Sequence, residues 1–157
     1  MDNQKRSNQL TGVSGVHFVV ARLSYVNLNA VPTTRNVPGP DVLVSNPSGS
    51  KAVSLQVKTT ESALRTRGRG KQKKPHHYEW DIGWSSAKLN HPNLFFGLVD
   101  LKSFTELPDI FIVPSEVIFK YFERGDPAKW PRARYHPPLE DIRQFKNNWS
   151  LLEKALK

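Results

Sequence analysis

The chain of 157 residues contains no cysteine. This absence excludes disulfide bonds, metal sites built from thiolates and catalysis by a cysteine nucleophile. The chain also lacks any apolar run near the roughly eighteen residues that a membrane-spanning helix needs, so we expect no membrane partner. Its polar start, "MDNQKRSNQLTG", has no apolar segment behind it. We therefore expect no secretory signal and a cytoplasmic location.

Acidic residues are few relative to basic ones. The chain has 23 Lys and Arg against 14 Asp and Glu, which gives a formal net charge of +9. Such an excess favours a polyanionic partner, most often nucleic acid, although a basic protein without such a partner is the alternative. The length and the 38% content of hydrophobic residues are typical of one globular domain. We expect a single domain over residues 1–157, with residues 1–9 disordered.

Three helices are predicted. The first covers residues 11–27, where Thr11 or Ser14 is a candidate N-cap. The second begins at Ser115 and ends at Gly125, and an amphipathic helix over residues 139–157 closes the chain. Apolar side chains that recur every three or four residues lie on one face of a helix. The first helix has five of them: Val13, Val16, Val20, Leu23 and Val26.

About five strands are predicted. Residues 29–36 form a short edge strand, in which Pro32 lacks the N–H that a ladder needs. Residues 41–45 and 51–60 form a hairpin around a tip rich in turn residues. Two continuous apolar runs, over residues 94–101 and 109–115, are typical of central strands. This order of elements predicts an α/β (α+β) fold, with a mixed central sheet flanked by helices.

The hairpin has a polar face that suits a metal site. Side chains alternate along a strand, so Gln56 and Lys58 point away from the apolar face of the second strand. If the strands pair around residues 46–50, Asp41 lies opposite the region of Gln56. The Asp41 carboxylate, the Gln56 amide and the Val57 carbonyl then offer Mg²⁺ the oxygen ligands that it prefers. The alternative is a surface pair of Asp41 and Lys58, worth less than about 1 kcal/mol.

Residues 12–60 resemble the core of the PD-(D/E)XK nuclease superfamily. Its signature is an acid at the start of one strand and an acid-x-lysine sequence on the next. Here "GPD" (39–41) matches the first half and "QVK" (56–58) matches the second. Glutamine replaces the acid, as it does in Mrr-type restriction nucleases. The segment "GVSGVHFVVARL" is also similar to the first helix of small bacterial members.

The resemblance implies a restriction-endonuclease-like core and hydrolysis of phosphodiester bonds with Mg²⁺ or Mn²⁺. It implies that Asp41 ligates the metal, that Gln56 assists through its side-chain oxygen, and that Lys58 positions the attacking water. DNA is a more natural partner than RNA for such a protein. Nucleases that cut both strands often form dimers, so a homodimer is an open alternative to a monomer.

One departure from the family concerns the first helix, where such nucleases place a glutamate that points at the metal. Val16 occupies this position, and His17 is rotated by about 100° around the helix. Glu61, Glu79 and Asp81 are candidate substitutes that their spacing does not rank. Two alternatives to a nuclease therefore stay open. One is an inactive module of this fold that binds nucleic acid or a protein, and the other is a basic α/β protein-interaction domain.

Residues 61–93 are predicted to form an irregular, basic loop insertion. Aromatic residues near its middle could stack on bases or hold the loop against the core. The adjacent pair His76 and His77 is only weak support for a metal site, because no third ligand has a suitable spacing. The alternative is a solvated loop without partners. Six basic side chains of this loop are candidate phosphate contacts: Arg65, Arg67, Arg69, Lys71, Lys73 and Lys74.

Overall fold

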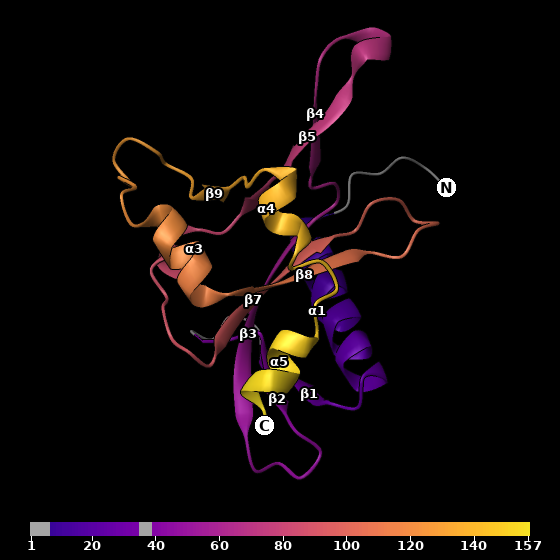
Figure 1. Cartoon of the computed structure of the whole chain (residues 1–157), viewed down its shortest axis with the longest axis vertical. Helices are drawn as coiled ribbons and strands as arrows, with labels where there is room; N and C mark the ends of the chain where they lie inside the picture. The colour runs from indigo at the N-terminus through magenta and orange to yellow at the C-terminus, as the bar shows by residue number, and fades with distance from the viewer. Residues whose placement is uncertain (1–6, 35–38) are drawn as a thin grey trace.

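The fold begins with a helix of 18 residues, α1 (Asn8–Tyr25), in a computed structural model that describes residues 7–34 and 39–157 (Figure 1). The helix starts one turn before the predicted Thr11, because the Ser7 side chain accepts a hydrogen bond from the Leu10 N–H and caps it. Asn8 and Gln9 are thus helical, with Ser7 as the N-cap, and these three residues are not disordered. The rest of the predicted disordered segment, residues 1–6, lies outside the described residues. No helix in the described part of the chain is long and apolar enough to cross a membrane.

Five strands form a mixed central sheet in the order β1-β2-β3-β7-β8. Only β3 and β7 run parallel, and the other neighbours are antiparallel. The predicted mixed sheet of about five strands flanked by helices is therefore confirmed. Its members are β1 (Asn29–Pro32), β2 (Val42–Ser45), β3 (Ala52–Thr60), β7 (Leu94–Asp100) and β8 (Asp109–Pro114).

Each face of the sheet carries its own apolar core, because side chains alternate along every strand. Leu55 and Val57 of β3 pack in the cluster of buried residues that includes the α1 side chains. Phe96 and Leu98 of β7 belong to a second cluster on the opposite face. This second face is covered by α3 (Ser115–Phe122), the short helix α2 (Trp84–Ala87), and the two-residue strands β6 (Trp80–Asp81) and β9 (Arg134–Tyr135).

Helix α1 approaches β3 very closely at Gly15. A Cβ atom built there would lie 1.8 Å from the Thr59 Oγ1 atom, so a larger residue requires movement of the helix or the strand. The buried side of α1 runs through Thr11, Gly15, Val19 and Leu23, which is offset from the predicted valine stripe. Small side chains at this crossing hold the first turns of α1 over the C-terminal half of β3.

The prediction of an irregular loop over residues 61–93 is wrong, because this region contains a second, two-stranded sheet. Strands β4 (Leu64–Arg67) and β5 (Lys74–Tyr78) pair with each other and are joined through the 3₁₀ turn η1 (Gly70–Gln72), and His77 of β5 forms one isolated bridge with Pro138. We call residues 64–78 the basic hairpin. It projects from one end of the molecule (Figure 1). Its strands lack alternating apolar residues because most of its side chains are exposed, which removes the usual sequence signal.

The closing helix that was predicted over residues 139–157 is divided into α4 (Leu139–Arg143) and α5 (Ser150–Ala155). Between them, Asn147 has a positive φ of 50°, which ends regular helix geometry. The chain runs here along the outer edge of β8. The Ile112 N–H donates to the Phe145 carbonyl at 2.9 Å, and the Asn147 N–H donates to the Ile110 carbonyl at 2.7 Å. Backbone pairing with β8 thus replaces the middle of the predicted helix.

An ion cluster anchors this crossing at the start of β8. The Asp109 carboxylate lies 2.8 Å from the ammonium groups of both Lys102 and Lys146. Burial alone would raise the pKa of Asp109, but the two hydrogen-bonded ammonium groups hold it below its ordinary value. Lys146 belongs to the segment that pairs with β8, so the cluster joins the β7–β8 connection to the C-terminal part of the chain.

Candidate active site

The backbone of Asp41 is fixed at the end of the β2–β3 ladder. Its N–H donates to the Leu55 carbonyl at 2.8 Å, and its carbonyl accepts from the Thr33 N–H at 2.9 Å. Pro40, which precedes it, accepts a hydrogen bond from the Thr33 hydroxyl. Residues 37 and 38 of the predicted turn before Asp41 lie outside the described residues. Hydrogen bonds on both sides therefore hold Asp41 in strand register, opposite the middle of β3.

The Asp41 carboxylate meets β3 as the sequence predicts. Its Oδ2 atom accepts hydrogen bonds from the Gln56 side-chain Nε2 at 2.6 Å and from the Val57 backbone N–H at 2.7 Å. The N–H and the carbonyl of one residue in a strand point to the same edge. The Val57 carbonyl therefore also faces the edge on which Asp41 lies. The structure brings together the three groups considered as metal ligands.

These groups fit a divalent cation only in part. In the described chain, no group of three or more His, Cys, Asp and Glu side chains is arranged to hold a metal ion. Asp41 supplies one carboxylate, and the Gln56 side chain turns its NH₂ group toward it. The Gln56 amide must rotate to present its oxygen instead. With that rotation the donor set consists of oxygens alone, which suits Mg²⁺ that keeps several water ligands.

Lys58 lies two residues beyond Gln56 on the same face of β3. In the parallel register with β7 it pairs with Leu98, whose side chain belongs to the core opposite α1. Burial lowers the pKa of the Lys58 ammonium, while the charges of Asp41 and Asp81 oppose this effect. Lys58 is thus a partly desolvated amine within electrostatic reach of Asp41. Partly buried ionisable groups with a charged partner are common at functional sites.

The three acids considered as substitutes for a helix glutamate have different surroundings. Glu79 lies 3.1 Å from the Arg65 guanidinium and 3.8 Å from that of Arg134, so it is engaged at the base of the basic hairpin. Glu61 is exposed. Asp81 is the one whose charge acts on Lys58. It lies on β6, opposite Arg134 of β9.

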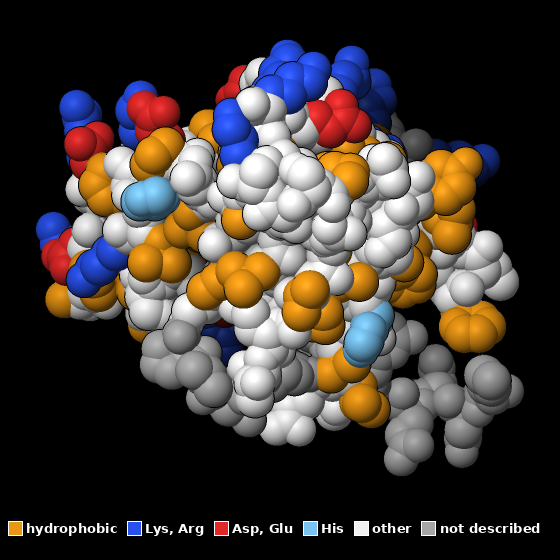
Figure 2. Space-filling model, turned by 90° about the horizontal axis from the view of Figure 1, so that it is seen from below, with side chains coloured by type: hydrophobic (Ala, Val, Ile, Leu, Met, Phe, Trp, Pro, Cys, Tyr) orange, Lys and Arg blue, Asp and Glu red, His pale blue; other side chains and the backbone are white. Residues whose placement is uncertain are grey.

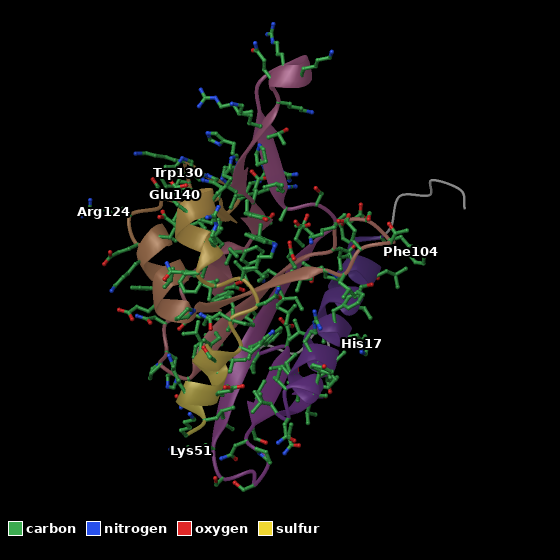
Figure 3. All side chains as sticks on the ribbon, turned by 45° about the vertical axis from the view of Figure 1, so that its right-hand side comes forward. His17, Lys51, Phe104, Arg124, Trp130 and Glu140 are labelled. Atoms are coloured by element: carbon green, nitrogen blue, oxygen red, sulfur yellow. The ribbon has the colours of Figure 1, made fainter. Side chains whose placement is uncertain are left out.

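Val16 lies near Asp41, where the resemblance to the nuclease superfamily implies a helix glutamate. Both residues line a cavity of about 290 Å³ between α1 and the sheet. Asp41 is its only acidic lining residue among the described residues. His17 was predicted to face away, yet it lines the same cavity and remains exposed; Figure 3 shows it on α1. The complete lining consists of Gly12, Val13, Val16, His17, Pro32, Thr33, Asp41 and Val57.

The six basic residues predicted to contact phosphate are gathered on the basic hairpin. Five of them are exposed, and Arg65 is half-buried beside Glu79. The hairpin lies at the opposite end of the molecule from Lys51 (Figure 3). Figure 2 shows the end away from the hairpin, where Lys and Arg lie mostly at the rim of the view. The positive charge is therefore distributed asymmetrically, with a dense group on one projecting element.

The two histidines of the basic hairpin have a third histidine as a neighbour, which the sequence did not indicate. The Nδ1 atoms of His76 and His77 are 2.8 Å apart, and the ring centroids of His77 and His136 are 5.9 Å apart. Burial and the neighbouring histidines lower the pKa of His77. His136 follows β9, which is distant in sequence, so spacing alone does not reveal this contact. The contact joins the hairpin to the segment that follows α3.

Comparisons with known proteins support the fold. No family model matches the chain, and no curated protein sequence matches it either. Among solved structures, the chain is similar to a bacterial homing endonuclease, I-Ssp6803I, with a TM-score of 0.53 and 16% sequence identity. The match covers 94% of this chain and 93% of that one. Similarity at this level of identity concerns the fold and not the activity.

Proposed function

We propose that this chain, which has the restriction-endonuclease-like fold of the PD-(D/E)XK nucleases, hydrolyses phosphodiester bonds of DNA with Mg²⁺ or Mn²⁺. The observation that carries the proposal is the contact of Asp41 Oδ2 with Gln56 and Val57, at 2.6 and 2.7 Å. It occurs where the superfamily signature requires an acid to meet the second strand. When bound, the metal lowers the pKa of a water and stabilises charge on the phosphate.

The protein side chains have separate tasks in this proposal. Asp41 supplies the negative charge of the site, and the Gln56 amide oxygen and the Val57 carbonyl complete the oxygen-lined edge. Lys58 presents its ammonium beside Asp41, where it donates a hydrogen bond to the attacking water or to the phosphate oxygens. Partial burial of Lys58 strengthens such interactions, because the surrounding dielectric is lower than that of water.

The basic hairpin supports DNA as the partner. Lys and Arg side chains that neutralise phosphates supply most of the sequence-independent affinity for nucleic acid. A two-stranded ribbon fits the major groove of B-DNA, whereas the major groove of A-form RNA is too narrow for protein side chains to read. A projecting antiparallel ribbon with six basic residues therefore favours duplex DNA over duplex RNA.

A second candidate function is an inactive nuclease-fold module that binds nucleic acid. Val16 favours it, because this side chain lines the cavity beside Asp41 and offers no ligand. The site then has a single carboxylate, which is the lower end of the one or two that a Mg²⁺ site usually receives from protein.

A cleavage assay separates these functions. We expect the purified protein to cut a mixture of genomic DNA fragments in Mg²⁺ or Mn²⁺, and chelation of the metal to abolish cutting. New ends are detected by sequencing, so that rare, sequence-specific cuts are not missed. Salt-sensitive binding without new ends would identify the inactive module. Absence of both binding and cutting would contradict a nucleic-acid function.

The contribution of the hairpin is measurable through the salt dependence of DNA binding. We expect the triple substitution Arg67→Gln, Arg69→Gln and Lys71→Gln to weaken binding and to lower the slope of log K against log salt by about 2–3, because each lost phosphate contact contributes about 0.9. The binding constant is measured between about 50 and 200 mM salt by fluorescence anisotropy.

The matched control removes the same charge elsewhere. Lys51, Lys154 and Lys157 are exposed residues at the other end of the molecule, near the C-terminus and the β2–β3 loop (Figure 1). Their replacement by glutamine should leave the salt slope close to that of the wild-type protein. Equal slopes for the two triple variants would exclude a specific role of the hairpin.

A further inference from the structure

A larger cavity, of about 500 Å³, lies beside α3 and β9, apart from the site around Asp41. Aromatic rings form much of its wall, and arginine side chains add positive charge. No residue of this cavity lines the pocket that contains Asp41 and Val16. Its wall includes Trp84, Tyr121, Phe122, Trp130, Arg132 and Arg134.

The aromatic wall is held in place by contacts within the protein. The Trp84 Nε1–H donates to the Trp130 carbonyl at 2.8 Å, and the Trp84 ring meets that of Phe122 edge to face. Gly125 permits this position, since a Cβ atom there would lie 2.6 Å from the Trp84 ring. The Tyr121 hydroxyl is 2.7 Å from the His136 Nδ1 atom. The rings therefore form a prepared surface and do not depend on a ligand for their arrangement.

Much of this aromatic surface is exposed. The exposed fraction is 56% for Trp130 and 41% for Tyr121. Soluble proteins rarely leave large aromatic side chains together in solvent unless they form a binding site. Tryptophan and tyrosine rings provide flat, rigid faces on which a planar ligand can stack at a small cost in conformational entropy.

The charge at the cavity indicates an anionic ligand. Arg134 shares the Glu79 carboxylate with Arg65, and its own distance to that group is the longer one, 3.8 Å against 3.1 Å. Arg132 is exposed and has no ion pair within the described residues. The two guanidinium groups thus retain positive charge that Glu79 does not neutralise. Guanidinium groups bind phosphate through two parallel hydrogen bonds.

The cavity is continuous with the elements that carry the proposed function. His136 contributes to its wall and contacts His77 of the basic hairpin. On the other side, Arg134 is the β-ladder partner of Asp81, whose charge acts on Lys58. The cavity therefore lies between the basic hairpin and the strand pair that carries Asp81.

We propose that this cavity binds one unpaired nucleotide of the DNA substrate, with its base against Trp84, Tyr121 and Trp130 and its phosphate at Arg132 and Arg134. The inference rests on the proposed function, because it assigns the cavity to the same substrate. Bases stacked in a duplex cannot enter a pocket, so the nucleotide must be extrahelical or single-stranded. The cavity volume is within the range of small-molecule sites and accommodates a base with its sugar.

The test uses two duplexes that differ only in one base. Each carries a single-nucleotide bulge, which is a thymidine in the first and an abasic residue in the second, so the phosphates are identical. Binding is measured by fluorescence anisotropy in the presence of a chelator, which prevents cleavage. We expect the wild-type protein to bind the thymidine bulge about 10-fold more tightly, as one stacked base contributes an effect of this size.

The variant Trp130→Ala should bind both duplexes with equal affinity, close to that of the wild-type protein for the abasic duplex. Phe104→Ala is the matched control, because Phe104 is 86% exposed and lies away from the cavity, as Figure 3 shows. The control should keep the 10-fold preference of the wild-type protein. Arg132→Gln should weaken binding of both duplexes to a similar degree.

Two results would overturn the assignment of the cavity alone. One is equal affinity of the wild-type protein for the two duplexes, and the other is a preference that survives Trp130→Ala. Both leave salt-sensitive binding through the hairpin, and hence the proposed function, intact. Absence of binding to either duplex at low salt would overturn the proposed DNA partner together with the cavity assignment.

Discussion

Replacement of Asp41 by asparagine should lower the rate of metal-dependent DNA cleavage by about 10³-fold or more. Asp41 accepts hydrogen bonds from Gln56 and Val57. It is also the only acidic residue among the described residues that line the cavity between α1 and the sheet. Asparagine removes the negative charge but keeps an oxygen that can accept the hydrogen bond of the Val57 N–H. The rate is measured in single turnovers at saturating protein, so that weaker DNA binding does not imitate a slower chemical step.

Two further measurements make this result specific. The free energy of unfolding of the Asp41→Asn variant should stay within about 1 kcal/mol of the wild-type value, because one acceptor is retained. Asp141→Asn is the control, since Asp141 is an exposed acid on α4. It should cleave at the wild-type rate. Unchanged cleavage by Asp41→Asn would contradict the assignment of this carboxylate to the reaction.

Replacement of Lys58 by methionine should lower the cleavage rate by about 10²-fold or more and leave the protein at least as stable at neutral pH. Methionine keeps the length of the side chain and removes the ammonium. Burial is the main cause that lowers the pKa of Lys58, which means that the folded protein bears a cost to keep this group charged. A gain or no loss of stability with a large loss of rate indicates a residue kept for its chemistry.

The pH dependence of stability provides a second readout for Lys58. Its pKa in the folded state lies below the ordinary value of 10.5, so the destabilising effect is fully present at pH values below the folded pKa. The effect disappears as the pH rises through the folded pKa toward 10.5 and above. The advantage of Lys58→Met over the wild-type protein should therefore shrink between neutral and alkaline pH, as measured by urea unfolding.

Lys51→Met is the matched control for this substitution. Lys51 is an exposed lysine just before the same strand. The control should cleave at the wild-type rate. A Lys58→Met variant that retains full activity would contradict the role of the ammonium, whatever its stability.

The central sheet was predictable because the apolar residues of its strands follow regular patterns. In β3 the alternation of Leu55 and Val57 with Gln56 and Lys58 determines which side chains face the core, and the structure has the same division. The continuous apolar runs of β7 and β8 reflect burial on both faces of the sheet. The approach of Asp41 to Gln56 follows from the hairpin register alone, so this part of the site required no long-range information.

The closing helix was predicted wrongly for a reason that lies in the tertiary packing. Its apolar stripe is regular, but the members pack on opposite faces of the sheet. Ile142 and Phe145 pack in the cluster with α3, whereas Trp149, Leu152 and Leu156 pack in the cluster with α1. The chain must pass around the edge of β8 between them, which a straight helix cannot do. A regular helical spacing of apolar residues does not show that these residues pack in two different cores.

The aromatic cavity could not be predicted from the sequence. Trp84, Tyr121 and the pair of Trp130 and Arg132 belong to three separate segments, and each residue alone is interpreted as a packing or surface residue. Only the pairing of β6 with β9 and the position of α3 bring these segments together. The basic hairpin was predictable in part, because its charge was evident from the sequence and its strand pairing was not.

The passage of residues 145–147 along β8 has a consequence for the behaviour of the protein at high concentration. An unpaired strand edge can recruit a strand from another molecule and so start aggregation. Here the outer edge of β8 already has two backbone hydrogen bonds. The Ile112 N–H donates to the Phe145 carbonyl at 2.9 Å, and the Asn147 N–H donates to the Ile110 carbonyl at 2.7 Å. The opposite edge, β1, has four residues and ends at Pro32, which has no N–H to donate. The segment between α4 and α5 thus protects the β8 edge of the sheet against strand addition. At the β1 edge, Pro32 limits strand addition.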